Sequence, residues 1–193
     1  MAFPRWLLAM GLVLPSSGHA EDPLRETALL PPVSPACISS PFGPRVLPNR
    51  PLAGRFHNGI DMPAPAGAPV RAAAPGKVMR IQRKGPGGLE VHVQHGGFIG
   101  IYSHLGMVTP ALAEGKTTLA AGETLGVVGH SGVIYGLHLY FEMLVAGHPV
   151  DPAPYLGIPL CHGGIYRTRA DTLAPDGKVP PTRHYTRPAL SRG

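Results

Sequence analysis

Short runs of alternating apolar and polar residues, separated by glycine and proline, most constrain how this chain folds. Residues 136–143 read GLHLYFEM, so the apolar residues Leu137, Leu139, Phe141 and Met143 alternate with polar ones. Alternate residues of a strand point to opposite faces of a sheet, so this run predicts a strand with those four side chains inward. His138, Tyr140 and Glu142 are then expected together on the opposite face.

The same kind of pattern recurs along the chain. Residues 89–95 read LEVHVQH, and further short runs between turn signals are GKVMRIQRK, FIGIYSHL and TLGVVGH. No segment has a long helical period. We therefore predict a mainly β fold, with an antiparallel β-sheet core that is rich in loops and has few or no helices.

The first residues have the pattern of an export signal. Arg5 is followed by an apolar run from Trp6 to Leu14, and the small residues Gly18 and Ala20 have the spacing of a cleavage site. This run is too short to span a bilayer, so residues 1–20 are predicted to be a cleaved secretory signal, with an uncleaved anchor as the alternative.

The remaining 173 of the 193 residues are expected to hold one domain of ordinary size. We predict a linker over 21–38, the β domain over 39–162, and a basic, disordered tail over 163–193. The formal net charge is +6, but no dense basic run has interleaved aromatic residues, which argues against a nucleic-acid partner. No other stretch is apolar enough for a transmembrane helix.

The only two cysteines, Cys37 and Cys161, flank the predicted domain. In an oxidising compartment they could form one disulfide that closes a long loop. Two unpaired buried thiols are the alternative. An even pair that brackets a domain in an exported chain favours the disulfide.

Three histidines and an aspartate are candidates for chemistry. His57 and Asp61 stand on either side of Gly59, and nearby prolines predict a loop that could bring both side chains to one point. His104 ends one predicted strand and His138 lies on another. A hydrolytic zinc centre needs three protein ligands, an open position for water, and nearby imidazoles that move protons.

Several motifs occur in one order along the chain: SSPFGPR, FHNGIDMPAPAGAPVRAAAPGKV, VQHGGFIGIYSHLG, GETLGVVGHSGVIYGLHLYFEM and HPVDPAPYL. Over roughly residues 39–156 they resemble the lysostaphin-type (LytM-like) zinc metallopeptidase domain. The resemblance implies a β-sheet core with a substrate groove. It also implies that the substrate is peptidoglycan, cut at peptide bonds in its cross-bridges or stems.

The resemblance also implies roles for single residues. His57 and Asp61 match two zinc ligands, His104 matches a catalytic-site histidine, and His138 matches the histidine proposed as the general base. The family's third zinc ligand is the second histidine of a His-x-His motif, and that position is Tyr140 here. Tyrosine binds a metal only as a phenolate, and its free pKa is ~10, so zinc would have to displace the proton.

Two interpretations follow, both placing the protein outside the cytoplasm, in the periplasm or the cell wall. In the first, the chain is a zinc endopeptidase with one Zn²⁺ and unusual ligation, or one whose catalysis is impaired or altered by Tyr140. In the second, it is a non-catalytic protein that binds peptidoglycan or activates another wall hydrolase. A stabilising metal site unrelated to the wall is a weaker third reading. We expect core or loop roles for His95 and His130.

Overall fold

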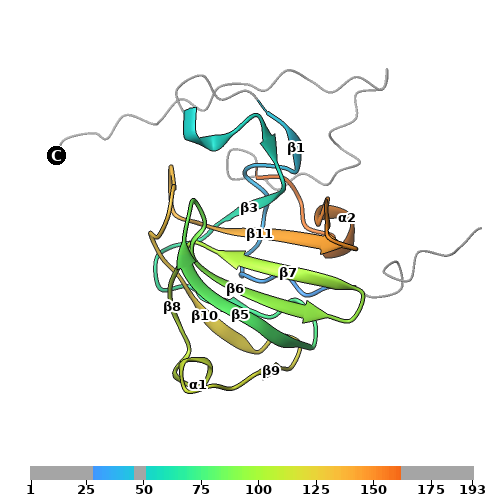
Figure 1. The fold of residues 1–193 in the computed structure, drawn as a ribbon. Helices are drawn as coiled ribbons and strands as arrows, with labels where there is room; N and C mark the ends of the chain where they lie inside the picture. The colour runs from blue at the N-terminus through green and yellow to red at the C-terminus, as the bar shows by residue number, and fades with distance from the viewer. Residues whose placement is uncertain (1–27, 46–50, 162–193) are drawn as a thin grey trace, which may run out of the picture.

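The computed structural model describes residues 28–45 and 51–161, and these residues form mainly β structure (Figure 1). The strands are β1 (Gly43–Pro44), β2 (Phe56–His57), β3 (Gly59–Pro63), β4 (Pro69–Arg71), β5 (Gly76–Lys84), β6 (Gly88–His95), β7 (Phe98–Ser103), β8 (Leu105–Val108), β9 (Thr118–Leu119), β10 (Thr124–Val128), β11 (His138–Val145) and β12 (His148–Val150). The described helical segments are η1 (Pro51–Ala53), α1 (Pro110–Ala113) and α2 (Ala153–Leu156). The prediction of a β fold with few helices is confirmed.

The largest sheet has seven strands in the order β12-β11-β7-β6-β5-β9, with β3 paired to β11 beside this path. All of its pairings are antiparallel. In Figure 1, β11, β7, β6 and β5 lie side by side across the molecule. β11 is the central strand for the site, because β3 pairs with its residues 138–142 and β7 with its residues 140–144.

The alternation in β11 gives the sheet one apolar face. Leu139, Phe141 and Met143 are completely buried, while His138 and Tyr140 lie on the other face. Leu137 was expected inward as well, but it precedes the strand and is exposed. The expected alternation therefore holds from residue 138 onward, where pairing with β3 begins.

A second sheet, in the order β4-β10-β8, contributes to the same hydrophobic core. Val70, Leu125 and Leu105 from this sheet are fully buried. They belong to one cluster with Val91 of β6 and Phe141 of β11. Burial of apolar surface between the two sheets is thus the main source of stability that fixes β11 in place.

A buried polar chain crosses this core. The backbone N–H of Ala73 donates to the hydroxyl oxygen of Tyr102 at 2.9 Å, and the hydroxyl of Tyr102 lies 2.9 Å from Nε2 of His95. Nδ1 of His95 lies 3.1 Å from the carbonyl of Pro75. Because that carbonyl can only accept, Nδ1 carries the proton, and Nε2 accepts from Tyr102. His95 therefore sits in the core, away from the candidate site.

The segment before the domain packs on it. Leu29, Val33 and Ile38 are buried in the main core, and Cys37 and Cys161 form a disulfide that spans 124 positions. The described part of the expected linker over 21–38 is thus an integral part of the fold, because its apolar residues pack into the core of the domain. The expected signal over 1–20 and tail over 163–193 lie outside the described residues.

No helix in the described ranges is long and apolar enough to cross a membrane.

Candidate functional site

The candidate site lies where β3 and β11 run side by side. The register places Asp61 opposite Tyr140, and Tyr140 opposite Ser103 on β7. A side chain on Gly59 would put its Cβ 2.4 Å from the carbonyl oxygen of Phe141, so only glycine allows β3 to approach β11 this closely. His57 lies on the short strand β2 and Asp61 on the short strand β3. The prediction of a loop around these two residues is wrong.

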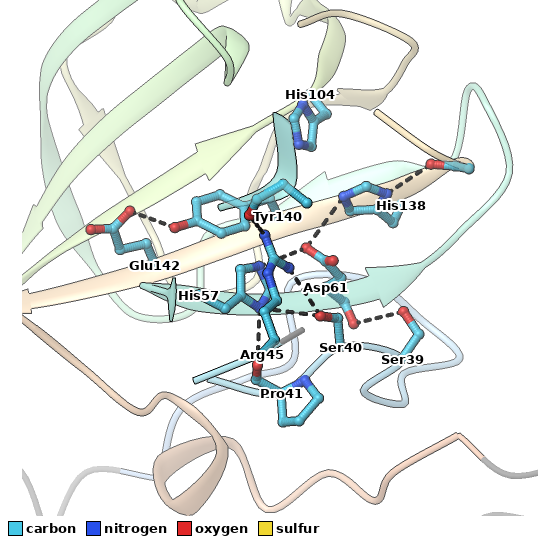
Figure 2. A network of polar contacts seen from close by, with 12 residues as sticks. Ser39, Ser40, Pro41, Arg45, His57, Asp61, His104, His138, Tyr140 and Glu142 are labelled. Carbon is cyan, nitrogen blue, oxygen red and sulfur yellow. Dashed lines mark hydrogen bonds and ion pairs between the residues drawn. The ribbon is translucent and has the colours of Figure 1, made fainter. Parts of the chain in front are cut away.

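Two imidazoles meet one carboxylate at the centre of the site (Figure 2). Nε2 of His57 lies 3.2 Å, and Nε2 of His138 3.3 Å, from the same oxygen, Oδ1 of Asp61. Burial raises the pKa of Asp61, but the hydrogen bonds and positive charges of His138 and His57 outweigh it and lower the pKa well below its usual range. Asp61 is thus a carboxylate at neutral pH.

The three site histidines share one orientation. Nδ1 of His57 donates to the carbonyl of Pro41 at 3.0 Å, Nδ1 of His104 to the carbonyl of Ser131 at 2.9 Å, and Nδ1 of His138 to that of Gly136 at 2.7 Å. A carbonyl only accepts, so each ring is fixed with Nδ1 as the donor.

His104 and His138 face each other with ring centroids 4.8 Å apart. Burial lowers the pKa of His104, which favours its neutral form. Burial also lowers the pKa of His138, but the hydrogen bond and charge of Asp61 outweigh this and raise it overall. Opposite shifts in neighbouring groups suit one proton acceptor and one proton donor.

The backbone of His104 is in the left-handed region, with φ 65°, which is uncommon for a residue with a side chain. Its N–H donates to the carbonyl of Gly87, and its carbonyl accepts from the N–H of Gly129, both at 2.9 Å. This anchoring on two sides aims the imidazole at the site.

Tyr140 turns away from the His57–Asp61 pair. Its hydroxyl donates to Oε2 of Glu142 at 2.7 Å, as Figure 2 shows. Burial, together with the nearby negative charges of Glu142 and Asp61, raises the pKa of Tyr140 far above its usual range. Tyr140 is therefore a neutral hydroxyl whose proton is held by Glu142.

A second carboxylate lies further along the same face of the sheet. Glu90 accepts hydrogen bonds from Gln82 at 2.6 Å and from Ser103 at 3.1 Å, and it pairs with His92 at 3.1 Å. Burial raises its pKa, but these hydrogen bonds outweigh that and lower it overall. Glu90 stays charged, and its charge contributes to the raised pKa of Glu142.

The candidate site opens into a groove of about 680 Å³. His57, Asp61, His104, His138 and Tyr140 all contribute to it. Further lining residues are the carboxylates Glu90 and Glu142, the cation Arg45, and the exposed apolar residues Leu52, Phe56, Tyr135 and Leu137. A polar floor with an apolar rim suits a peptide.

The donor set does not fit a three-ligand zinc site. His57 and Asp61 supply two suitable donors, but the expected third, Tyr140, is a neutral hydroxyl that donates to Glu142. Among the described residues, no three His, Cys, Asp or Glu side chains are arranged to hold a metal ion. The side chains present form a hydrogen-bonded cluster with acid–base groups.

The model of peptidase family M23 matches residues 55–152 of the chain, which include all five of these site positions. Among curated relatives, the DD-carboxypeptidase/endopeptidase Mpg of Neisseria meningitidis is 40% identical over 60% of this chain. The peptidoglycan DD-endopeptidase ShyA of Vibrio cholerae is 34% identical over 71% of it. These matches cover 26% and 31% of the relatives, so the chain spans less than a third of their length.

Solved structures agree on the fold. A zinc-containing peptidase from Vibrio cholerae is 29% identical, with a TM-score of 0.54 over 68% of this chain and 40% of that one. The catalytic domain of lysostaphin from Staphylococcus simulans is 24% identical, with a TM-score of 0.55 over 63% of this chain and 92% of that one. The expected fold, a β-sheet core of the lysostaphin type, is confirmed.

Sequence reasoning placed His57, Asp61, His104, His138 and Tyr140 at one site, and the structure brings these five together. It assigned no role to Glu142, the partner of Tyr140, or to Arg45. The two-residue spacing on one strand was the signal for Glu142, because residues two apart share a face. Arg45 ends the motif SSPFGPR, but nothing in the sequence shows that its side chain reaches the groove.

Proposed function

Because the chain belongs to peptidase family M23, we propose that its groove binds the peptide part of peptidoglycan and that hydrolysis there is impaired or altered. The relative from Vibrio cholerae whose name specifies peptidoglycan supports this substrate. The groove also suits a peptide, with carboxylates and imidazoles on its floor and apolar side chains at its rim. Family membership alone does not establish activity, which depends on the side chains of the site.

The hydrogen bond from Tyr140 to Glu142 carries the proposal of altered hydrolysis. In this family the position would supply the third zinc ligand, and zinc would supply a polarised water for attack on the peptide bond. Here the hydroxyl is neutral and already paired at 2.7 Å. A zinc ion held by His57 and Asp61 alone would bind weakly, because a missing ligand removes one metal–ligand bond and leaves the tetrahedral arrangement incomplete.

The remaining residues keep functions that need no metal. His57 and Asp61 form a polar anchor on the groove floor, and His104 and His138 can exchange protons with a bound peptide. These contacts support recognition of peptide amides, with or without cleavage. The same groove would serve a non-catalytic partner of another wall hydrolase.

We also propose that the protein is exported and works in the periplasm or the cell wall. The signal pattern over 1–20 supports this location. The disulfide between Cys37 and Cys161 supports it independently, because such bonds form and persist in oxidising compartments.

The test uses the chain from Glu21 onward and purified peptidoglycan sacculi. Co-sedimentation measures binding, and chromatography of released peptides measures cleavage, for the native chain and for Tyr140→His with added zinc. We expect binding by both proteins, with cleavage at least tenfold faster for Tyr140→His. Absence of binding by both proteins would overturn the proposed substrate. Equal, fast cleavage by the native chain would overturn the proposed impairment and favour an active zinc endopeptidase.

A further inference from the structure

We infer that Arg45 is the carboxylate-binding residue of the groove and takes a free α-carboxylate of the bound peptide. The inference rests on the proposed function, in which the groove binds peptidoglycan peptides. It adds the chemical group by which such a peptide is recognised and oriented.

Arg45 directly follows β1 and reaches over the site from the side of Ser40 and Pro41 (Figure 2). Its Nη1 donates to the hydroxyl of Ser40 at 3.2 Å, and its Nη2 donates to the carbonyl of Ala53. The backbone N–H of Arg45 donates to the carbonyl of Arg55 at 2.9 Å, which fixes the segment. The guanidinium is thus held in one position at the groove.

Both side-chain partners of Arg45 are neutral. Within the described ranges, the ion pairs join His57 and His138 to Asp61, His92 to Glu90, and Lys116 to Glu123, and none involves Arg45. Its Nε is buried and has no hydrogen-bond partner. A half-buried cation without a counter-ion is costly, and an anionic ligand at the groove would offset that cost.

Arg45 lines the same groove as the other site residues, among them His138 and Tyr140. An anion bound by Arg45 would therefore lie next to these side chains.

A carboxylate is the anion that fits a peptide groove. A guanidinium offers a planar fork of N–H donors, which matches the two oxygens of a carboxylate. Each terminal nitrogen of Arg45 makes one hydrogen bond to the protein, which leaves further N–H groups for a ligand. A peptidoglycan stem peptide with diaminopimelate offers three such groups: the carboxylate of its terminal D-alanine, the α-carboxylate of its γ-linked D-glutamate, and the free carboxylate of its diaminopimelate.

The test measures binding of synthetic stem pentapeptides, L-alanyl-γ-D-glutamyl-meso-diaminopimelyl-D-alanyl-D-alanine, by isothermal titration calorimetry. The arms are the free peptide and three peptides amidated at one carboxylate each: that of the terminal D-alanine, of the D-glutamate, or of the diaminopimelate. Each is titrated into the native chain, Arg45→Gln, Arg45→Lys and Arg55→Gln. Arg55 is the matched control, because it is exposed, its carbonyl accepts from the backbone N–H of Arg45, it does not line the groove, and its substitution removes the same charge.

We expect amidation of one of the three carboxylates to weaken binding to the native chain about tenfold or more, which corresponds to about 1.4 kcal/mol. Arg45→Gln should bind the free peptide more weakly than the native chain by the same factor, and it should no longer distinguish the free peptide from that amidated one. Arg45→Lys should recover only part of the lost affinity. Arg55→Gln should behave as the native chain. The carboxylate whose amidation weakens binding is the one that Arg45 binds.

Equal binding of all four peptides to the native chain would overturn the role of Arg45 and leave the proposed function standing. Loss of affinity in Arg55→Gln equal to that in Arg45→Gln would also overturn it, because the effect would then be one of general charge. No binding of any peptide would overturn the proposed function itself. The comparison of peptides on the native chain stays decisive even if Arg45→Gln does not fold.

Discussion

Tyr140 donates its hydroxyl proton to Oε2 of Glu142 across 2.7 Å, although it lies opposite Asp61 in the register of β3 and β11. Residues 140 and 142 are two apart on one strand, so both side chains point to the groove face. The carboxylate of Glu142, rather than the His57–Asp61 pair, is the partner that satisfies the phenol. This contact is the observation on which the proposal of altered hydrolysis rests.

The pair should be measurable as a coupling energy. Tyr140→Phe removes the donor and leaves the half-buried carboxylate of Glu142 short of a hydrogen bond, so we expect the free energy of unfolding to fall by about 1–3 kcal/mol. Urea unfolding of Tyr140→Phe, Glu142→Ala and the double variant forms a double-mutant cycle, because alanine removes the acceptor. The expected coupling is about 1 kcal/mol or more. Additive effects of the two changes would show that the hydrogen bond does not form in solution.

The buried His95 should make stability depend on pH. Burial lowers its pKa from the ordinary 6.5, although the carbonyl of Pro75 opposes the shift. The unfolded chain therefore takes up a proton at higher pH than the folded one. The stability that neutral His95 contributes is present above pH 6.5 and is lost as the pH falls through the lower, folded-state pKa.

Urea unfolding of the native chain and of His95→Gln between pH 7.5 and pH 5 measures this effect, and the native chain should lose more stability on acidification. His130→Gln is the control, since His130 is exposed, and it should follow the native curve. Identical pH dependence in the native chain and His95→Gln would contradict the role of His95.

The disulfide should contribute a large share of the stability. Cys37 and Cys161 close a loop that spans 124 positions, and in the chain-entropy model a loop of this size is worth about 4–5 kcal/mol. We expect the Cys37→Ser, Cys161→Ser double variant to lose about 2–5 kcal/mol of unfolding free energy, and added reductant to destabilise only the native chain. A double variant as stable as the native chain would show that the bridge contributes nothing.

The sequence carries enough information for the β architecture, because alternation in the runs around Val91 and Phe141 reports directly which face of a strand is buried. The sequence also predicts which residues share the site, because its motifs, in their order, resemble those of one peptidase family. It does not report that Leu29, Val33 and Ile38 pack into the core. Their spacing has no period, and only the exposed apolar surface of the folded domain explains their burial.

Side-chain direction is the part of the site that sequence reasoning does not supply. The choice of Tyr140 between Asp61 and Glu142 depends on rotamers and on the competing carboxylates, which only coordinates resolve. The position of Arg45 depends likewise on its hydrogen bonds to the backbone carbonyls of Ala53 and Arg55. No local sequence pattern predicts these two contacts.

The zinc affinity of the chain from Glu21 onward tests the proposed role of Tyr140 most directly, and competition with a zinc chelator of known affinity measures it. The native chain, Tyr140→His and the Tyr140→His, Asp61→Ala double variant are compared, and circular dichroism checks that each is folded. Our prediction is that Tyr140→His binds one zinc ion at least 10- to 100-fold more tightly than the native chain, and that the double variant loses this gain. Tight binding of one zinc ion by the native chain, unchanged in Tyr140→His, would contradict it.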